Sequence, residues 1–93
     1  MKVSIILVNY NSSALLRQCL KSIYEQTKEI PFEIIVVDNA SSDNSREIVC
    51  SEFSNVQLIK SAENLGFSRG NNLGASLAKG TYLLFLNTDT ILF

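Results

Sequence analysis

The sequence contains no histidine, and this absence narrows the chemistry that the protein could perform. Histidine is the most common general base in enzymes and the most common transition-metal ligand in proteins. Any acid, base or metal chemistry of these 93 residues must therefore use carboxylates, and nine aspartate and glutamate residues supply them.

Excess positive charge is also lacking. The formal net charge is −1 and the isoelectric point is near 5.3, so the chain has no broad positive field with which to neutralise a nucleic acid. A single bound nucleotide remains compatible with this charge. However, no G-x-G-x-x-G follows the first apolar run, and no G-x-x-x-x-G-K-[ST] occurs anywhere, which excludes the dinucleotide and P-loop fingerprints.

Cysteine usage and the N-terminal run indicate the compartment. Cys19 and Cys50 each fall inside a predicted helix, outside any spaced framework, and we interpret them as buried free thiols in a reducing compartment. The first apolar run breaks at Asn9 without a cleavage pattern, and no run approaches transmembrane length. We expect a cytoplasmic protein, with any contact to the inner face of a membrane made through parts outside this sequence.

The residues that are present suit one small folded domain, since 46% are hydrophobic and only 18% are charged. Short apolar runs at residues 3–8, 32–37, 56–59 and 82–86 predict four strands. Between these runs, apolar residues recur at helical spacing, which predicts three helices. We expect each helix to begin and end at polar residues or glycines. This alternation predicts an α/β fold, with a mostly parallel sheet and helices on both faces.

The helix boundaries are predicted from capping residues. Ser12 or Ser13 is placed to cap the first helix, which ends near Gln26, and residues 41–43 offer oxygens to cap the second. Gly66 opens the third helix, and Gly80 can end it in the left-handed conformation.

Polar side chains follow all four predicted strands. Ligands of open α/β sheets bind beyond the carboxyl ends of the strands, where loops and helix N-termini converge. The polar groups there are Asn9, Tyr10 and Asn11, then Asp38 and Asn39, then residues 61–64, and finally Asn87, Thr88 and Asp89. Their joint pattern predicts a polar pocket that bears carboxylates.

Each of these features also has a structural interpretation. Asp38 begins a run that suits a turn, and on spacing alone the turn and the binding role are equally favoured. Tyr10 fits ordinary packing, and Asn64 fits a plain turn. For Gly70 and Gly74 we favour close approach of the third helix to the sheet.

The charged residues leave alternatives open as well. Arg69 and Lys60 fit solvated charges, but Arg69 falls in the first turn of a helix that opens onto the pocket, where it suits a phosphate oxygen. Asp89 follows a buried apolar run, and binding of a cation would offset the cost of desolvating its carboxylate.

Four motifs occur in a characteristic order. They are VSIILVNYN, EIIVVDNASSDNS, ENLGFSRGNN and AKGTYLLFLNTD. This series resembles the start of the family-two inverting glycosyltransferases, and most closely their rhamnosyltransferase-type branch. The similarity spans essentially the whole chain and implies the Rossmann-like half of a GT-A domain.

The resemblance assigns roles to the strand-end residues. It implies that Asn9, Tyr10 and Asn11 line the base and ribose pocket and that Asp38 accepts a hydrogen bond from the base. It places Arg69 and Asn71 near the diphosphate and adds these further nucleotide-binding residues: Asn39, Asn64 and Asn87. The D-x-D element of the family falls on residues 87–89, where Asn87 replaces the first aspartate, so Asp89 would carry most of the binding of Mg²⁺ or Mn²⁺.

The resemblance also implies the reaction. A dTDP- or UDP-sugar would donate the sugar to a hydroxyl of a glycan or lipid-linked glycan, with inversion and with a carboxylate general base beyond these residues. Residues 1–93 would form a single truncated donor-binding domain without the acceptor-binding half, inactive alone. A stand-alone nucleotide-binding or interaction module is the alternative, and a nucleotidyltransferase is disfavoured because its glycine- and arginine-rich loop is absent. The fourth strand and the apolar residues 91–93 would favour a homodimer.

Overall fold

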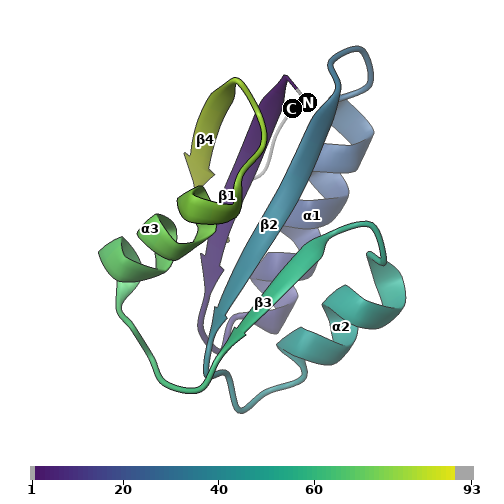
Figure 1. Ribbon diagram of the computed structural model, residues 1–93. Helices are drawn as coiled ribbons and strands as arrows, with labels where there is room; N and C mark the ends of the chain where they lie inside the picture. The colour runs from purple at the N-terminus through teal and green to yellow at the C-terminus, as the bar shows by residue number, and fades with distance from the viewer. Residues whose placement is uncertain (1, 90–93) are drawn as a thin grey trace.

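The computed structural model describes residues 2–89 of the chain, in which strands and helices alternate. The elements are β1 (Val3–Asn9), α1 (Ser13–Gln26), β2 (Phe32–Asn39), α2 (Ser45–Glu52), β3 (Gln57–Ser61), α3 (Phe67–Leu77) and β4 (Tyr82–Leu86) (Figure 1). The strands form one sheet in the order β3-β2-β1-β4, and every pairing in it is parallel. The predicted α/β class is confirmed.

Helices cover both faces of the sheet. Ile5 and Leu7 of β1 pack into the larger core cluster with the apolar residues of α1 and with Val49 of α2. Ile6 and Val8 point the other way and pack against α3, which lies in front of the strands in Figure 1, while α1 lies behind them. This arrangement explains why β1 and β2 are continuous apolar runs, because both of their faces are buried. None of the helices within residues 2–89 is long and apolar enough to cross a bilayer.

Two glycines let α3 lie close to the sheet. A Cβ atom added at Gly74 would lie only 2.6 Å from Cγ2 of Ile6, and one at Gly70 would lie 3.0 Å from both γ-carbons of Val8. The packing role predicted for these glycines is therefore confirmed. The N-terminal end of α3 is held over the carboxyl ends of β1 and β2 by this contact.

The prediction that Gly80 ends α3 in the left-handed conformation is wrong. The helix ends at Leu77, and Ala78 after it is extended, with φ −72° and ψ 141°. Gly80 is needed for space, because a Cβ there would lie 2.6 Å from the backbone nitrogen of Ser4. The left-handed glycine is Gly66, which precedes α3 with φ 79°.

The two cysteines differ in their surroundings, although both are free thiols. Cys19 lies in the core on α1, as predicted, but Cys50 is exposed on α2, so the interpretation of both as buried was wrong. The buried stripe of α2 consists of Ser45, Ile48 and Val49, which is too narrow to include position 50.

Among the described residues, the strand β4 lies at one edge of the sheet and pairs only with β1. Its side chains from Tyr82 to Phe85 are between 42% and 60% exposed, unlike those of the central strands. The apolar residues 91–93 of the proposed dimer contact lie outside the described residues, and the homodimer remains a prediction.

Substituting Gly74 by alanine tests the close packing of α3. Alanine at an ordinary helix position stabilises by about 0.5–1 kcal/mol relative to glycine, but here the added methyl overlaps Ile6, and we expect a loss of about 1–3 kcal/mol. Urea unfolding measures the difference, and Asn72→Ala on the exposed side of the same helix is the matched control. A Gly74→Ala variant as stable as the wild type would contradict the packing role.

Candidate nucleotide-binding site

The carboxyl ends of the strands bring the predicted polar residues together at one edge of the sheet (Figure 1). In the strand register Asn9 lies beside Asp38, and Asp38 lies beside Lys60. Asn39 lies beside Ser61, and Asn87 follows the last residue of β4. This juxtaposition follows from the parallel topology alone, as predicted.

Asp38 is the centre of a buried hydrogen-bond network at this edge. Its side chain is 1% exposed. Its Oδ1 accepts from Nδ2 of Asn9 at 3.0 Å and from the hydroxyl of Ser41 at 2.6 Å. Its Oδ2 accepts from the backbone nitrogen of Ser41 at 3.1 Å and from Nε of Arg46 at 2.6 Å. Both oxygens therefore already accept hydrogen bonds within the chain. The bonds to Ser41 form a turn, which was one of the two roles predicted for Asp38.

Arg46 extends this network to a third strand. Its NH2 nitrogen donates to the carbonyl of Ser61 at 2.9 Å, so one side chain of α2 links the end of β2 with the end of β3. Burial raises the pKa of the Asp38 carboxyl, but hydrogen bonds from Ser41, Arg46 and Asn9 outweigh burial and hold that pKa below its ordinary value. Arg46 was not among the site residues predicted from the sequence. The available signal was its position in the first turn of α2, close to the strand end that bears Asp38.

A second set of hydrogen bonds joins the loops after β1 and β2. Asn11 has a positive φ of 50°, and its Oδ1 accepts from the backbone nitrogens of Ser42 at 2.7 Å and Asp43 at 3.3 Å. Asp43 in turn accepts from the backbone nitrogen of Ser13 at the start of α1 and from that of Ser45 at the start of α2. Asp43, one of the residues predicted to cap the second helix, thus bonds the start of both helices, whereas the side chain of Ser12 makes no capping bond to α1.

Within residues 2–89, three amide oxygens at or near this edge are buried and have no hydrogen-bond partner in that part of the chain. They belong to Asn9, Asn39 and Asn71. Asn39 is 2% exposed, and its Nδ2 donates to the carbonyl of Gly66 at 3.1 Å, just before α3. A buried acceptor without a partner costs free energy, so each of these oxygens is suited to accept from a bound molecule or an ordered water.

The remaining predicted residues are more accessible. The ring of Tyr10 is 50% exposed, and Arg69 is exposed in the first turn of α3, where no described residue pairs with it. Asn64 is exposed too, and its Oδ1 accepts from the backbone nitrogen of Gly66 at 2.9 Å. This bond forms the plain turn that was one of the predictions for Asn64.

The segment after β4 offers oxygen ligands but no preformed metal cluster. Asn87 and Asp89 are both exposed, and the described residues contain no group of three or more potential ligands among histidine, cysteine, aspartate and glutamate. Cys19 on α1 donates from its sulfur to the carbonyl of Asn87 at 3.8 Å. Burial, with a smaller effect of the Asp89 charge, raises the pKa of this thiol to about 11, so it stays protonated at neutral pH and can donate this hydrogen bond.

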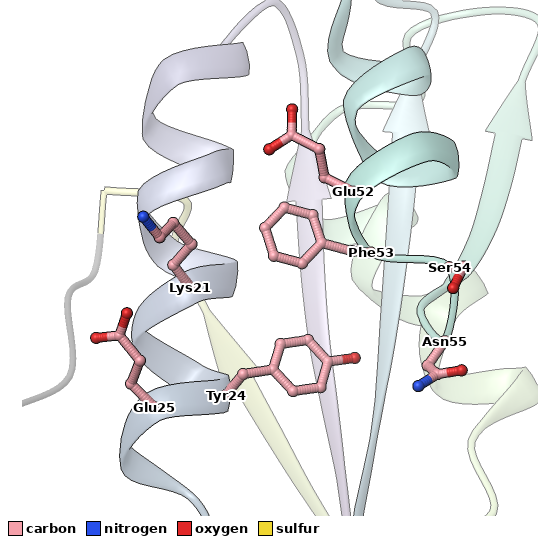
Figure 2. Close-up of a pocket in the computed structure, with 7 residues that line it drawn as sticks. All are labelled: Lys21, Tyr24, Glu25, Glu52, Phe53, Ser54 and Asn55. Atoms are coloured by element: carbon pink, nitrogen blue, oxygen red, sulfur yellow. The ribbon is translucent and has the colours of Figure 1, made fainter.

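A cavity lined by other residues lies away from this edge of the sheet. It has a volume of about 340 Å³ and opens between α1 and the segment that follows α2 (Figure 2). Its lining residues are Lys21, Tyr24, Glu25, Glu52, Phe53, Ser54 and Asn55, none of which was predicted to bind the nucleotide. We call it the Tyr24–Phe53 pocket.

Comparison with known families shows which family this chain belongs to. The sequence model of glycosyl transferase family 2 matches residues 4–93. This chain belongs to glycosyltransferase family 2. It is 40% identical over 91 residues to glycosyltransferase GlyA of Streptococcus pneumoniae, covering 95% of this chain and 13% of that protein. It is 39% identical over 95 residues to a poly(ribitol-phosphate) beta-glucosyltransferase of Bacillus spizizenii, covering 96% of this chain and 15% of that protein.

Solved structures with the same fold also match this chain. A crystal structure of S. aureus TarS matches with a TM-score of 0.86 and 30% identity, covering 96% of this chain and 28% of that one. TarS has also been solved with UDP and with UDP-GlcNAc. A mannosyltransferase from Pyrobaculum calidifontis, solved with GDP-Man and Mn²⁺, matches with a TM-score of 0.85 and 26% identity, covering 97% of this chain and 28% of that one. The likeness to TarS confirms the Rossmann-like part of a GT-A domain, whereas the rhamnosyltransferase branch remains a prediction.

The lowered pKa of Asp38 predicts how stability depends on pH. Asp38→Asn breaks the ion pair with Arg46, and we expect the free energy of unfolding to fall by about 3 kcal/mol at pH 7. This value is at the low end for a buried pair, because the Arg46 side chain is 32% exposed. The contribution of the ionised carboxylate is complete above the unfolded pKa of about 3.9 and is lost as the pH falls through the lower folded pKa.

The stability difference between wild type and Asp38→Asn should therefore narrow below about pH 4 in urea titrations. Glu63→Gln, which removes an exposed carboxylate near the same edge, is the control and should change stability little at either pH. A difference that stays constant from pH 7 to pH 3 would show that ionisation of Asp38 does not stabilise the fold.

Proposed function

We propose that this chain forms the donor-binding part of an enzyme that transfers a sugar from a nucleoside diphosphate sugar to an acceptor hydroxyl with inversion. The observation that carries the proposal is the convergence of polar and charged side chains from β1, β2, α3 and the end of β4 on one sheet edge of a family-two domain. The complexes of TarS with UDP and UDP-GlcNAc support a uridine nucleotide as the donor carrier. A dTDP-sugar, which the rhamnosyltransferase-type motifs favour, is the second donor to test.

The base contact is better assigned to Asn39 than to Asp38. Both oxygens of Asp38 already accept within the chain, whereas Oδ1 of Asn39 is buried and has no partner among the residues that the structure describes. Uracil and thymine each carry a ring N–H that needs such an acceptor when it leaves water. The half-exposed ring of Tyr10 would cover a face of the base, and Asp38 would act indirectly by holding Asn9 and Arg46 in place.

The diphosphate contact is assigned to the start of α3. Arg69 is exposed there and is not engaged by another described residue, so its guanidinium can pair with phosphate oxygens. The N-terminal end of a helix adds unpaired backbone N–H groups and a favourable partial charge for an anion. Gly66 allows the chain to turn sharply into this helix.

A divalent cation fits the end of β4 only in company with the donor. Asp89 and the amide oxygen of Asn87 are too few to hold a cation by themselves, but Mg²⁺ is commonly bound through one or two protein oxygens together with substrate phosphates and water. The Mn²⁺ in the mannosyltransferase complex supports this arrangement. When bound, the cation would neutralise the negative charge of the leaving nucleotide.

The acceptor is proposed to be a hydroxyl of a glycan or a lipid-linked glycan. We assign no catalytic residue to the described part of the chain, because Asp38 and Asp43 hold the fold at this edge and Asp89 suits the cation. A carboxylate general base would have to come from another part of the enzyme.

Replacing Arg69 separates the diphosphate contact from the base contact. Arg69→Ala should weaken the binding of UDP about tenfold or more, since one charge-assisted contact is lost, while the binding of uridine stays the same. Isothermal titration measures both affinities. Lys60→Ala removes an exposed positive charge near the same edge and is the matched control. Equal losses for UDP and uridine, or equal losses in the two variants, would contradict a specific phosphate contact.

Replacing Asp89 tests the cation site and the proposed function together. We expect UDP to bind more tightly in the presence of Mn²⁺ than in its absence, and Asp89→Asn to remove most of this gain, about tenfold, without changing metal-free binding. The titration is run with UDP, dTDP and GDP, and Glu47→Gln, on the exposed side of α2, is the control. Absence of binding to all three nucleotides in the wild type would refute a donor site in this chain.

A further inference from the structure

The Tyr24–Phe53 pocket lies at the opposite edge of the sheet from the nucleotide site. Tyr24 is in the last turn of α1, and Phe53 directly follows α2. In a parallel α/β sheet the carboxyl ends of helices lie at the amino-terminal edge of the strands, whereas Asn9 and Asp38 end β1 and β2 at the other edge. The pocket is therefore a separate feature, unused by the donor site.

The floor of this pocket is made of aromatic rings. The rings of Tyr24 and Phe53 are nearly parallel, with 10° between their planes, and their centroids are 6.2 Å apart. At this separation the rings are offset, and Figure 2 shows them next to each other with neither covering the other. Phe32 packs against Tyr24 from the side, at 5.7 Å and 54°, and holds its ring in place. Both floor residues are half-buried against the larger core cluster and rest on a rigid support.

Polar groups of both hydrogen-bonding types surround the rings. Lys21, Ser54 and Asn55 supply donors, and Glu25 and Glu52 supply acceptors. Glu52 is fixed in position because it accepts three hydrogen bonds from Arg17, the shortest of them 2.7 Å.

The hydroxyl of Tyr24 adds a neutral donor, because burial raises the pKa of this phenol. In Figure 2 this hydroxyl points toward the loop that carries Ser54 and Asn55. The pocket thus combines flat apolar faces with a polar border.

This combination limits the chemistry of a ligand. Lys21 balances Glu25, and Arg17 pairs with Glu52, so the pocket has no excess positive charge to attract an anion such as a nucleotide or a phosphate polymer. The polar border disfavours a purely apolar helix. A sugar ring has an apolar C–H face that suits the electron-rich face of an aromatic ring, and its hydroxyls both donate and accept around the periphery. The volume of about 340 Å³ lies within the range of small-ligand pockets.

We propose that the Tyr24–Phe53 pocket binds a neutral sugar unit of a glycan, with the sugar ring lying on the two aromatic rings. The choice of a glycan among amphipathic ligands rests on the proposed function, in which the acceptor or product is a glycan. Bound there, a growing chain would be held at one edge of the domain while its end reaches the donor site at the other. The pocket would raise the local concentration of acceptor without taking part in the chemistry.

The test titrates the 93-residue chain with neutral trisaccharides of glucose and of N-acetylglucosamine, monitored by amide chemical shifts. We expect binding with a Kd of about 1 mM, with shifts confined to the residues that line the pocket. Tyr24→Leu and Phe53→Leu keep apolar volume on the core but remove the aromatic faces, and each should weaken binding about tenfold. Phe85→Leu removes a half-exposed ring on β4, which does not line this pocket, and this variant should bind as the wild type does.

The variant Asn55→Ala and a titration with UDP provide two further tests. Asn55→Ala changes an exposed side chain, so it should weaken trisaccharide binding even if a leucine variant fails to fold. All folded variants should bind UDP with the affinity of the wild type. If the wild type binds a trisaccharide but not UDP, that result would refute the donor site and support this pocket. No binding of either trisaccharide by a wild type that binds UDP, or binding that Phe53→Leu and Asn55→Ala leave unchanged, would overturn the proposal.

Discussion

The carboxylate of Asp38 joins parts of the chain that are far apart in sequence, and the arrangement of the strand ends depends on it. Through Asn9 it connects to β1, through Ser41 to its own loop, and through Arg46 to α2 and the carbonyl that ends β3. A charge buried this deeply is tolerated only because four donors surround it. The network therefore sets the positions of Asn39 and the loop that leads to α3, which are the groups proposed to meet the base and the diphosphate.

Most of the fold was predictable because β1, β2 and β4 contain runs of apolar residues and α1 has a distinct apolar stripe. The range predicted for β4 agrees with the structure, and β1 to β3 differ from their predicted ranges by one or two residues. The errors concern backbone conformation and individual side chains. Gly80 serves close packing against Ser4, which is distant in sequence, and Cys50 falls outside the buried stripe of a short helix. Sequence spacing carries no information about either contact.

The candidate site was predictable to the level of the sheet edge but not to the level of individual roles. Parallel topology brings the strand ends together whatever their side chains, so Asn9, Asp38 and Asn39 were found correctly as neighbours. Which of them faces a ligand depends on which oxygens are already engaged, and that is decided by Arg46 and Ser41 in three dimensions. Aromatic residues such as Tyr24 and Phe53 look like ordinary core residues in the sequence, because their exposed faces become evident only when two helix ends meet.

The strand order has a consequence for folding during synthesis. The pairs β1–β2 and β2–β3 join strands that follow one another along the chain, but β4 pairs with β1, so this last ladder joins the two ends of the described chain. Contacts between such distant residues form slowly because a long loop must close first. While the ribosome is still making α3, the outer edge of β1 is unpaired, and its apolar residues and free backbone groups are open to wrong partners. A nascent chain of this fold therefore needs protection at one particular strand until its fourth strand emerges.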